Sequence, residues 1–335
     1  MKQSKFRVGV GQADLAQTWR LAFVARAAFF LLLLFLLHPA PSRAADAAPT
    51  PVAAGAEYVG QETCLQCHPA QGNQFAHTRH ARAFRENPKN ALEARVCEAC
   101  HGPGSLHVQD PLNRQALIGF TKAWGTPVAV QNATCLGCHN GGERLHWQAS
   151  LHSLNKVACS DCHNPMARQS ETGLLSRINV NEVCEGCHVQ QRNEFRRKSH
   201  MPLPEGKMTC NDCHNPHGSA TKPMLRAKSV NEICFTCHTE KRGPFLWEHA
   251  PVRENCANCH LPHGSNQDKL LVTARPFLCQ QCHAQANNHA ASLYNQSQSV
   301  GGGGTPSSRV MGRTCQNCHV QIHGSNHPSG ARFQR

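Results

Sequence analysis

The sequence has few of the residues that usually fill a protein interior. Of its 335 residues only 6% are aromatic, and the mean hydropathy is −0.47. Charged residues are also scarce, at 16%, which excludes the highly charged composition typical of disordered chains. The composition therefore predicts neither a dense apolar core nor a charged disordered tail, so something other than side chains must fill the interior.

The sequence also lacks an apolar run of the roughly 20 residues that cross a bilayer as a helix. Its apolar run over residues 27–37 (AAFFLLLLFLL) follows a basic stretch and precedes Pro39 and the small residues of PSRAADAA. This pattern predicts an exported protein with a signal peptide at residues 1–44, cleaved near Ala44 or Ala47, and an Ala/Pro-rich linker over 45–63. A retained N-terminal anchor is the alternative. No cysteine follows the run, which excludes a lipoprotein anchor.

No cysteine stands alone in this sequence. All 20 Cys fall into ten pairs with two residues between partners, and a His follows each pair directly. Export predicts an oxidising compartment, where a disulfide framework is the default interpretation of many cysteines. Zinc ribbons also use Cys-x-x-Cys pairs, but they do not require a His after each pair. The composition gives ten such His by chance a probability on the order of 10⁻¹².

Cys-x-x-Cys-His is the attachment signature of c-type haem, in which both thiols bond to the porphyrin and the His ligates the iron. The sequence therefore predicts ten haem c groups. The expected attachment residues are Cys64, Cys67, Cys97, Cys100, Cys135, Cys138, Cys159, Cys162, Cys184, Cys187, Cys210, Cys213, Cys234, Cys237, Cys256, Cys259, Cys279, Cys282, Cys315 and Cys318. The expected proximal iron ligands are His68, His101, His139, His163, His188, His214, His238, His260, His283 and His319.

Ten haems leave only about 29 residues of the expected mature chain for each haem, so the porphyrin faces must form most of the core. The predicted fold class is a multihaem cytochrome c, an elongated haem wire wrapped by loops and short helices, with little regular secondary structure. We number the motifs 1 to 10 in chain order. Taken in twos, they predict a decahaem domain over residues 64–335 built from five two-haem modules.

Further His residues recur at fixed places in the modules. One precedes the second motif of a module, and another residue follows the proximal His of that motif, usually by three places. The expected distal iron ligands are His80, His107, His152, Met166, His200, His217, His249, His263, His289 and His323. His77, His146 and His327 remain unassigned. A residue three places after a proximal His is poorly placed to reach the opposite face of the same haem, so we expect it to ligate a neighbouring one.

Met166 stands in CHNPM where sister modules have CHNPH and CHLPH. We expect it to ligate the haem of the Cys135 or the Cys184 motif. The alternative is that Met166 only packs against a porphyrin while His146 supplies the imidazole. A thioether favours ferrous iron and raises the potential of its haem, which favours electrons arriving from extracellular Fe(II).

Several connecting strings resemble those of the MtrA/DmsE family of decahaem c-type cytochromes, which includes MtoA-like and PioA-like proteins. They are CEACHGP from Cys97, CHNPHGS from Cys213, EKRGPFLWEHAPV from Glu240 and HGSNHPSG from His323. The resemblance implies a haem wire inside an outer-membrane β-barrel of the MtrB type, between periplasm and cell exterior. It implies periplasmic cytochromes or quinol-linked redox proteins as partners, with an outer-surface multihaem cytochrome or extracellular iron beyond. This sequence departs from the family at Met166, where MtrA has His.

The formal net charge of +13 does not predict a nucleic-acid surface. About +8 remains without residues 1–44, and the propionates and iron of ten ferric haems bring the total to about −2, so Lys and Arg are propionate partners. We therefore expect an electron-transfer protein and no enzyme, located in the periplasm and outer membrane. A soluble periplasmic shuttle is one alternative, and haem storage or a purely structural role is another. A multihaem reductase would need one haem whose iron has an open sixth coordination position. The spare His and Met166 suffice to occupy that position in all ten haems.

Overall fold

A computed structural model describes residues 54–283 and 315–334. The chain divides into two compact units, Met1–Pro49 and Thr50–Arg335. The predicted signal peptide, the first part of the predicted linker and His289 all lie outside the described residues. All described residues belong to the unit Thr50–Arg335.

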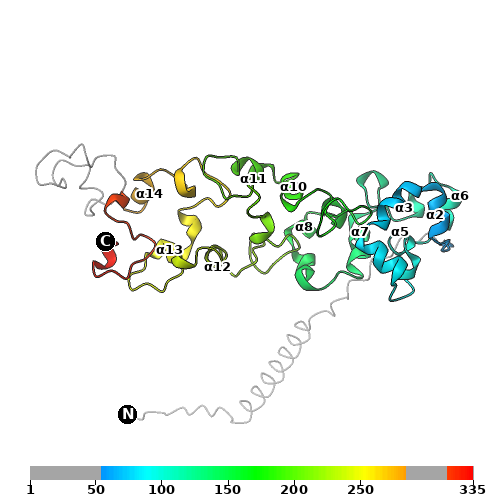
Figure 1. Cartoon of the computed structure of the whole chain (residues 1–335), viewed down its shortest axis with the longest axis horizontal. Coiled ribbons are helices and arrows are strands. Elements are labelled where there is room, and N and C mark those ends of the chain that lie inside the picture. The colour runs from blue at the N-terminus through cyan, green and yellow to red at the C-terminus, as the bar shows by residue number, and fades with distance from the viewer. Residues whose placement is uncertain (1–53, 284–314, 335) are drawn as a thin grey trace, which may run out of the picture. The chain divides into compact units, whose positions relative to one another are not determined.

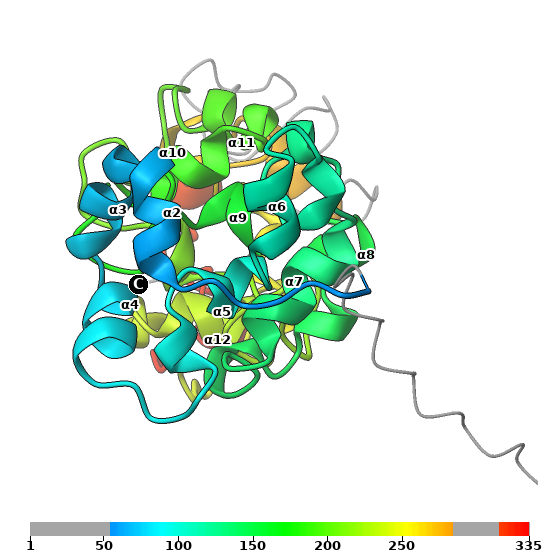
Figure 2. The ribbon, with the colours of Figure 1, turned by 90° about the vertical axis from the view of Figure 1, so that its right-hand side faces the viewer.

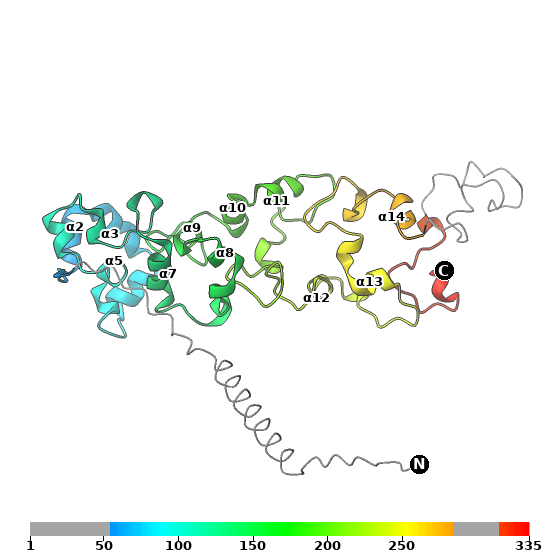
Figure 3. The same cartoon turned by 180° about the vertical axis from the view of Figure 1, so that it is seen from behind.

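The described parts of this unit contain short helices and turns but no β-strand, only isolated bridges. The helices lie along the unit broadly in chain order, with α2 (Gln61–Cys67) at one end and α14 (Phe277–Gln280) near the other (Figures 1 and 3). Seen from the α2 end, the helices point in different directions (Figure 2). The longest, α7, has nine residues. The prediction of a multihaem cytochrome fold with little regular secondary structure is confirmed.

All helices in the described residues are short. The α-helices are α2 (Gln61–Cys67), α3 (Pro69–Ala76), α4 (Arg79–Ala81), α5 (Glu98–His101), α6 (Ser105–Gln109), α7 (Val128–Leu136), α8 (Leu151–Leu154), α9 (Cys159–Cys162), α10 (Val180–Glu185), α11 (Val189–Glu194), α12 (Val230–Phe235), α13 (Ala250–Glu254) and α14 (Phe277–Gln280). The 3₁₀ helices are η2 (Glu93–Arg95), η3 (Arg114–Ala116), η4 (Lys122–Trp124), η5 (Gly142–Arg144), η6 (Trp147–Ala149), η7 (Cys210–Asp212), η8 (Thr239–Lys241), η9 (Cys256–Asn258), η10 (Asp268–Leu270), η11 (Cys315–Asn317) and η12 (Gly330–Arg332), and η1 (Arg82–Glu86) is a π-helix.

Side-chain caps start two of the helices that carry odd-numbered motifs, α10 and α12. The Asn179 side chain accepts a hydrogen bond from the Glu182 amide at 3.0 Å, and Ser229 accepts one from the Glu232 amide at 3.2 Å. Such N-caps satisfy amides that have no partner within the helix. The first cysteine of every odd-numbered motif lies in a helix, namely α2, α7, α10, α12 or α14.

Apolar side chains form little core in the described unit. The buried hydrophobic residues there are Phe75, Ala81, Val96, Ala116, Ile118, Trp147, Ala158, Phe195, Leu203, Leu225 and Leu271. One cluster forms among them, with partly buried residues packed against it: Phe75, Ala81 and Val96, contacted by Phe84, Cys97 and Met166. No described side chain is less than 2% exposed. Side-chain burial alone therefore contributes little to holding the modules together.

Return loops follow three even-numbered motifs. Each ends in an antiparallel bridge from the proximal His to a leucine: His163 to Leu175, His214 to Leu225 and His260 to Leu271. The bridge closes the loop, so the residue three places after the proximal His has a fixed position within it.

Glu98 ties the chain before motif 1 to motif 2. Its carboxylate is 3% exposed and accepts hydrogen bonds from the amides of Val59, Gly60 and Gly104, each at 2.9 Å. The Glu57 amide also donates to the Ser105 hydroxyl at 2.8 Å. Residues 57–60, which the sequence assigned to the linker, are therefore attached to the haem-motif region.

Replacing Glu98 with Gln is expected to loosen this attachment, because an amide nitrogen then faces backbone donors. The unpaired buried donors cost about 2 kcal/mol, or roughly thirtyfold in local opening. Hydrogen exchange of the amides of Val59, Gly60 and Gly104 measures the effect. Glu62→Gln, at an exposed position in α2, is the matched control. Unchanged exchange in Glu98→Gln would contradict the role given to the carboxylate.

Candidate haem-binding sites

The two motifs of each module meet at their first cysteines. A hydrogen bond with the Cys159 thiol, together with burial, raises the pKa of Cys135 far above its usual range. Burial and then the neighbouring thiol Cys256 raise the pKa of Cys234 to about 12. The five pairs are Cys64 with Cys97, Cys135 with Cys159, Cys184 with Cys210, Cys234 with Cys256 and Cys279 with Cys315. Haems attached within one module are therefore direct neighbours.

Second cysteines join one module to the next. Burial raises the pKa of Cys100 to about 11, and the nearby thiol Cys138 of the next module adds to the effect. The four pairs between modules are Cys100 with Cys138, Cys162 with Cys187, Cys213 with Cys237 and Cys259 with Cys282. The ten motifs thus form one continuous series in chain order, in which first cysteines lie near one another within a module and second cysteines lie near one another between modules.

A recurring asparagine connects the two motifs of the three central modules. It stands three residues before the first cysteine of the odd-numbered motif, at Asn132, Asn181 and Asn231. Its side-chain oxygen accepts a hydrogen bond from the amide of the first cysteine of the next motif, at 2.8, 3.0 and 2.7 Å. We did not predict from the sequence that these asparagines connect the motifs, although their fixed spacing before the first cysteine could have indicated it.

The proximal His of every even-numbered motif has one nitrogen fixed by the backbone. The Nδ1 atom lies 2.6–3.0 Å from a carbonyl oxygen, which can only accept, so Nδ1 carries the proton and donates. The pairs are His101 with Ile118, His163 with Gly173, His214 with Pro223, His260 with Lys269 and His319 with Arg332. Such a bond orients the ring and leaves Nε2 for a metal, as metal-ligating His usually requires.

Seven proximal His face seven of the predicted distal His. The ring centroids lie 5.9–6.3 Å apart in the pairs His68 with His107, His139 with His80, His163 with His217, His188 with His152, His214 with His263, His260 with His323 and His283 with His249. A metal with a nitrogen about 2.0 Å away on each side holds two imidazole centroids about 6.2 Å apart. The spacing therefore fits one iron between the rings of each pair.

The pairs follow a simple register. The residue after an even-numbered motif reaches back to the even-numbered motif of the preceding module, as His217 does to His163. The His that precedes an even-numbered motif reaches forward to the odd-numbered motif of the next module, as His152 does to His188. Among the pairs in the described residues, that of the first motif departs from this register, since His68 faces His107 of its own module. Three predicted ligands that follow an even-numbered motif thus lie opposite a proximal His of the neighbouring module, as we expected from their position. They are His217, His263 and His323.

The charge state and burial of the predicted distal His suit iron ligation. Burial lowers the pKa of His323 to about 4, and nearby Lys241 adds to the effect. Burial is also the main cause of lowered pKa values at His80, His217, His249 and His263. A neutral ring is the form that ligates a metal.

Two glycines that follow distal His allow the close approach of successive modules. Gly264, with φ +158°, would place a Cβ 1.9 Å from the carbonyl oxygen of Glu194. Gly218, with φ +109°, would place one 2.6 Å from the carbonyl oxygen of His146. No side chain fits at either position, so the loops that carry His263 and His217 lie directly on the preceding module.

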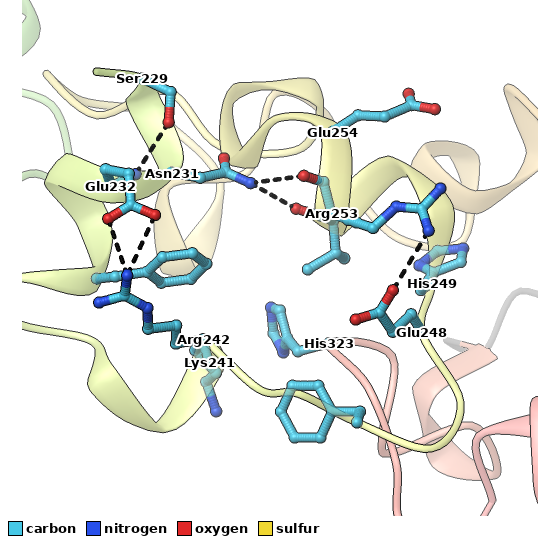
Figure 4. A pocket seen from close by; sticks show the side chains of 13 residues that line it. Ser229, Asn231, Glu232, Lys241, Arg242, Glu248, His249, Arg253, Glu254 and His323 are labelled. Carbon is cyan, nitrogen blue, oxygen red and sulfur yellow. Dashed lines mark hydrogen bonds and ion pairs between the residues drawn. The ribbon is translucent and has the colours of Figure 1, made fainter. Parts of the chain in front are cut away.

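A cavity of about 210 Å³ lies beside His249 and His323 (Figure 4). Its other lining includes Lys241 and two ion pairs, Arg242 with Glu232 at 3.2 Å and Arg253 with Glu248 at 3.4 Å. Both imidazoles face proximal His of neighbouring motifs. The cavity therefore belongs to the predicted haem series, and its basic side chains are candidates to pair with propionates.

The structure does not bring every predicted ligand to a proximal His. Nε2 of His200 lies 3.1 Å from a carboxylate oxygen of Glu205, and its Nδ1 donates to the Arg197 carbonyl at 2.6 Å. These two bonds raise the pKa of His200 and occupy both of its ring nitrogens, so neither is free for the haem of His238, its partner by the register. His289 lies outside the described residues.

We expected Met166 to ligate the haem of the Cys135 or Cys184 motif. The proximal His139 and His188 of those motifs face His80 and His152. Met166 packs against the cluster of Phe75, Ala81 and Val96, as Cys97 of motif 2 also does.

Neither a free metal site nor a membrane-crossing helix occurs in the described residues. No group of three or more His, Cys, Asp or Glu side chains converges there as a metal site, the arrangement that structural zinc requires. No helix in those residues is both long and apolar enough to cross a membrane.

Comparisons with known proteins agree with these sites. Residues 200–243 and 249–288 match a family model described as a doubled CXXCH motif, and residues 97–179 match one described as cytochrome c-type protein NrfB-like. The multiheme cytochrome MtrA of Shewanella baltica (strain OS185) is 41% identical to this chain over 276 residues, which covers 82% of this chain and 81% of that protein. The similarity therefore extends over most of both chains.

Proposed function

Because the chain belongs to the MtrA family of multihaem cytochromes, which transfer electrons and are not enzymes, we propose that it conducts electrons through ten haem c groups across the outer membrane, inside a β-barrel. Haem supplies one-electron redox chemistry when attached. The chain's own work is to fix the position, orientation and axial ligands of each haem.

One observation carries this proposal: the ten motifs form an unbroken series. The Cys135 thiol is hydrogen-bonded to Cys159 within one module, and the Cys162 thiol lies near Cys187 across the next junction. The alternation continues from Cys64 to Cys315. Electron transfer along a chain requires neighbouring cofactors in close contact, and no motif in this series stands apart.

The facing imidazoles favour conduction over catalysis. In seven of the ten motifs a second His stands opposite the proximal His. An iron held from both sides has no open position for a substrate. This arrangement speaks against the alternative of a multihaem reductase with an open haem.

The surroundings of the conduit are part of the proposal. A barrel of the MtrB type would enclose the haem series and insulate it from lipid. Periplasmic cytochromes or quinol-linked redox proteins would meet one end, and an outer-surface multihaem cytochrome or extracellular iron the other. We place the protein in the periplasm and outer membrane and propose Fe(II) oxidation with inward electron flow. A soluble periplasmic shuttle is the competing function.

Reconstitution in vesicles tests the conduit. The haem-loaded chain, co-purified with its barrel from detergent-extracted outer membranes, is expected to show ten haems by intact mass, each adding about 616 Da. Vesicles that carry the complex should pass electrons from external Fe(II) to enclosed oxidised cytochrome c. Vesicles with the barrel alone should not.

The matched control removes a haem from the middle of the series. Cys184→Ala with Cys187→Ala deletes the haem of motif 5, and conduction should fall at least a hundredfold because the remaining haems are separated. Fewer than ten haems in the wild type would overturn the proposed number. Recovery of the protein wholly in the osmotic-shock fraction, or undiminished conduction in the gapped variant, would favour the shuttle.

A further inference from the structure

The geometry points to Met166 as the sixth ligand of the haem attached at Cys97 and Cys100, opposite His101. This inference rests on the proposed haem series. It gives one haem of that series a thioether as its distal ligand, whereas the other expected distal ligands are imidazoles. Met166 stands in the second module, so it would complete a haem of the first.

The ligand register carries the first step. His217, His263 and His323 each follow an even-numbered motif and face the proximal His of the preceding even-numbered motif, at 6.0–6.2 Å between ring centroids. Met166 occupies the same place after motif 4. The same step backwards leads to motif 2, whose proximal ligand is His101.

The local backbone at Met166 repeats that at His217. The Met166 amide donates to the Asn164 side chain at 3.1 Å, as the His217 amide does to Asn215 at 3.1 Å. The Asn164 amide donates to the Leu174 carbonyl at 2.6 Å, and the Asn215 amide to the Met224 carbonyl at 2.8 Å. The two side chains therefore leave their loops in the same direction.

One feature of this loop differs from its sisters. Ala167 stands where the sister loops have Gly218 and Gly264, and the loop to the bridging leucine is one residue longer. We infer that the extra residue lets this loop accommodate the Ala167 side chain. The hydrogen bond from the Met166 amide to the Asn164 side chain is the same as in the sister loop.

Packing supplies the second, independent step. Gly218 and Gly264 lie against His146 and Glu194, which stand six residues before His152 and His200. The equivalent place in the first module is next to Phe75. Met166 does pack against the cluster of Phe75, Ala81 and Val96, and so does Cys97, the first attachment residue of motif 2. The thioether is thus beside the expected porphyrin.

His101 is prepared to take a ligand on its opposite side. Its Nδ1 donates to the Ile118 carbonyl at 2.8 Å, which leaves Nε2 for iron. Phe120 packs on the edge of its ring at 5.4 Å between centroids. Among the described residues no imidazole faces it in the manner of the seven pairs.

Two unassigned histidines are the possible competitors. The His146 carbonyl lies against Gly218, and the neighbouring Trp147 ring is 6.4 Å from that of His217, so His146 belongs beside motif 4. His77 is exposed at the end of α3, two residues from Phe75, and is the competitor that an experiment must exclude.

A thioether at this position sets the second haem of the series apart. Sulfur donates less strongly to ferric iron than imidazole does, so the Met-ligated haem has a higher potential than its bis-His neighbours. An electron entering the series would reside longest at that haem.

Near-infrared spectroscopy of the oxidised, haem-loaded full chain tests the ligand. The wild type should show the iron–sulfur charge-transfer band near 695 nm, with an intensity of about one haem in ten. Met166→His and Met166→Leu should abolish it, and Met166→His should also lower the potential of one haem in a redox titration. Ferrous Met166→Leu should bind about one equivalent of carbon monoxide, because its sixth position is open.

Matched variants locate the haem. The band should persist in His77→Ala, and also in His139→Ala and His188→Ala, which disable the haems of the Cys135 and Cys184 motifs. It should vanish in His101→Ala, whether that haem is retained or lost. An oxidised wild type without the band, a band that survives Met166→Leu, or one that disappears with His139 or His188 and not with His101 would overturn the inference. The number of haems and the conduction of the wild-type complex in vesicles do not depend on the presence of the band in the wild type, so failure of the conduit remains separately detectable.

Discussion

Replacing His217 with Ala is expected to open the haem of motif 4, attached at Cys159 and Cys162, and to leave the haem of its own motif 6 closed. The reason is the register: the His217 ring faces His163 of the preceding module at 6.0 Å. Carbon monoxide binding to the reduced protein should rise from near zero to about one equivalent per chain, and added imidazole should close the site again.

Double variants decide which haem has opened. In a background of Cys159→Ala with Cys162→Ala, His217→Ala should add no carbon monoxide binding, because the affected haem is gone. In a background of Cys210→Ala with Cys213→Ala, the binding should remain. The exposed His327 gives the control variant, His327→Ala, which should behave as the wild type. The reverse pattern in the two backgrounds would show that distal ligands stay within their own modules.

Omitting haem attachment is expected to prevent folding altogether. The chain produced without its leader in a cytoplasm that lacks haem-attachment enzymes should be monomeric and expanded, with a radius of gyration near 60 Å. The reason is the sparse apolar core, in which the described unit forms one small cluster around Phe75 and has no fully buried side chain. Without iron ligation, only isolated contacts such as the hydrogen bond from His152 Nδ1 to the Pro216 carbonyl and the bridge between Ser199 and Ser265 hold the loops after motifs 6 and 8 on the preceding module.

Small-angle scattering and far-ultraviolet circular dichroism compare this apo chain with the haem-loaded protein. Reducing agent should be present, because neighbouring first cysteines such as Cys135 and Cys159 would otherwise cross-link. A compact apo chain with the helical signal of the loaded protein would show that side chains hold the fold after all.

Much of the fold could be predicted because the haem motif constrains the chain locally. Each Cys-x-x-Cys-His sits within about one helical turn, so ten of them leave room for helices no longer than α7. The recurrence of residues such as His152 and His217 also indicated which side chains to consider as distal ligands. Both inferences depend only on spacing along the sequence.

The register of the ligands could not be predicted, because a two-haem repeat looks the same whether a ligand serves its own module or the next. Met166 shows the effect. We expected it to ligate a haem of a neighbouring motif in the sequence, and its packing against the cluster around Phe75, which Cys97 also contacts, favours motif 2. His200 shows another, since the carboxylate of Glu205 five residues later holds its ring in this structure. Such contacts depend on how modules stack, which sequence spacing does not encode.

The exchange of ligands between modules has a consequence for the order in which the protein is completed. If the chain is exported from its N-terminus, as we propose, His152 would arrive before motif 5, and the haem of that motif would find its distal ligand already present. The haem of motif 4 would wait for His217, a full module later. At each stage of the proposed export the newest even-numbered haem would be the one with an exposed iron, and each new module would protect the haem attached before it.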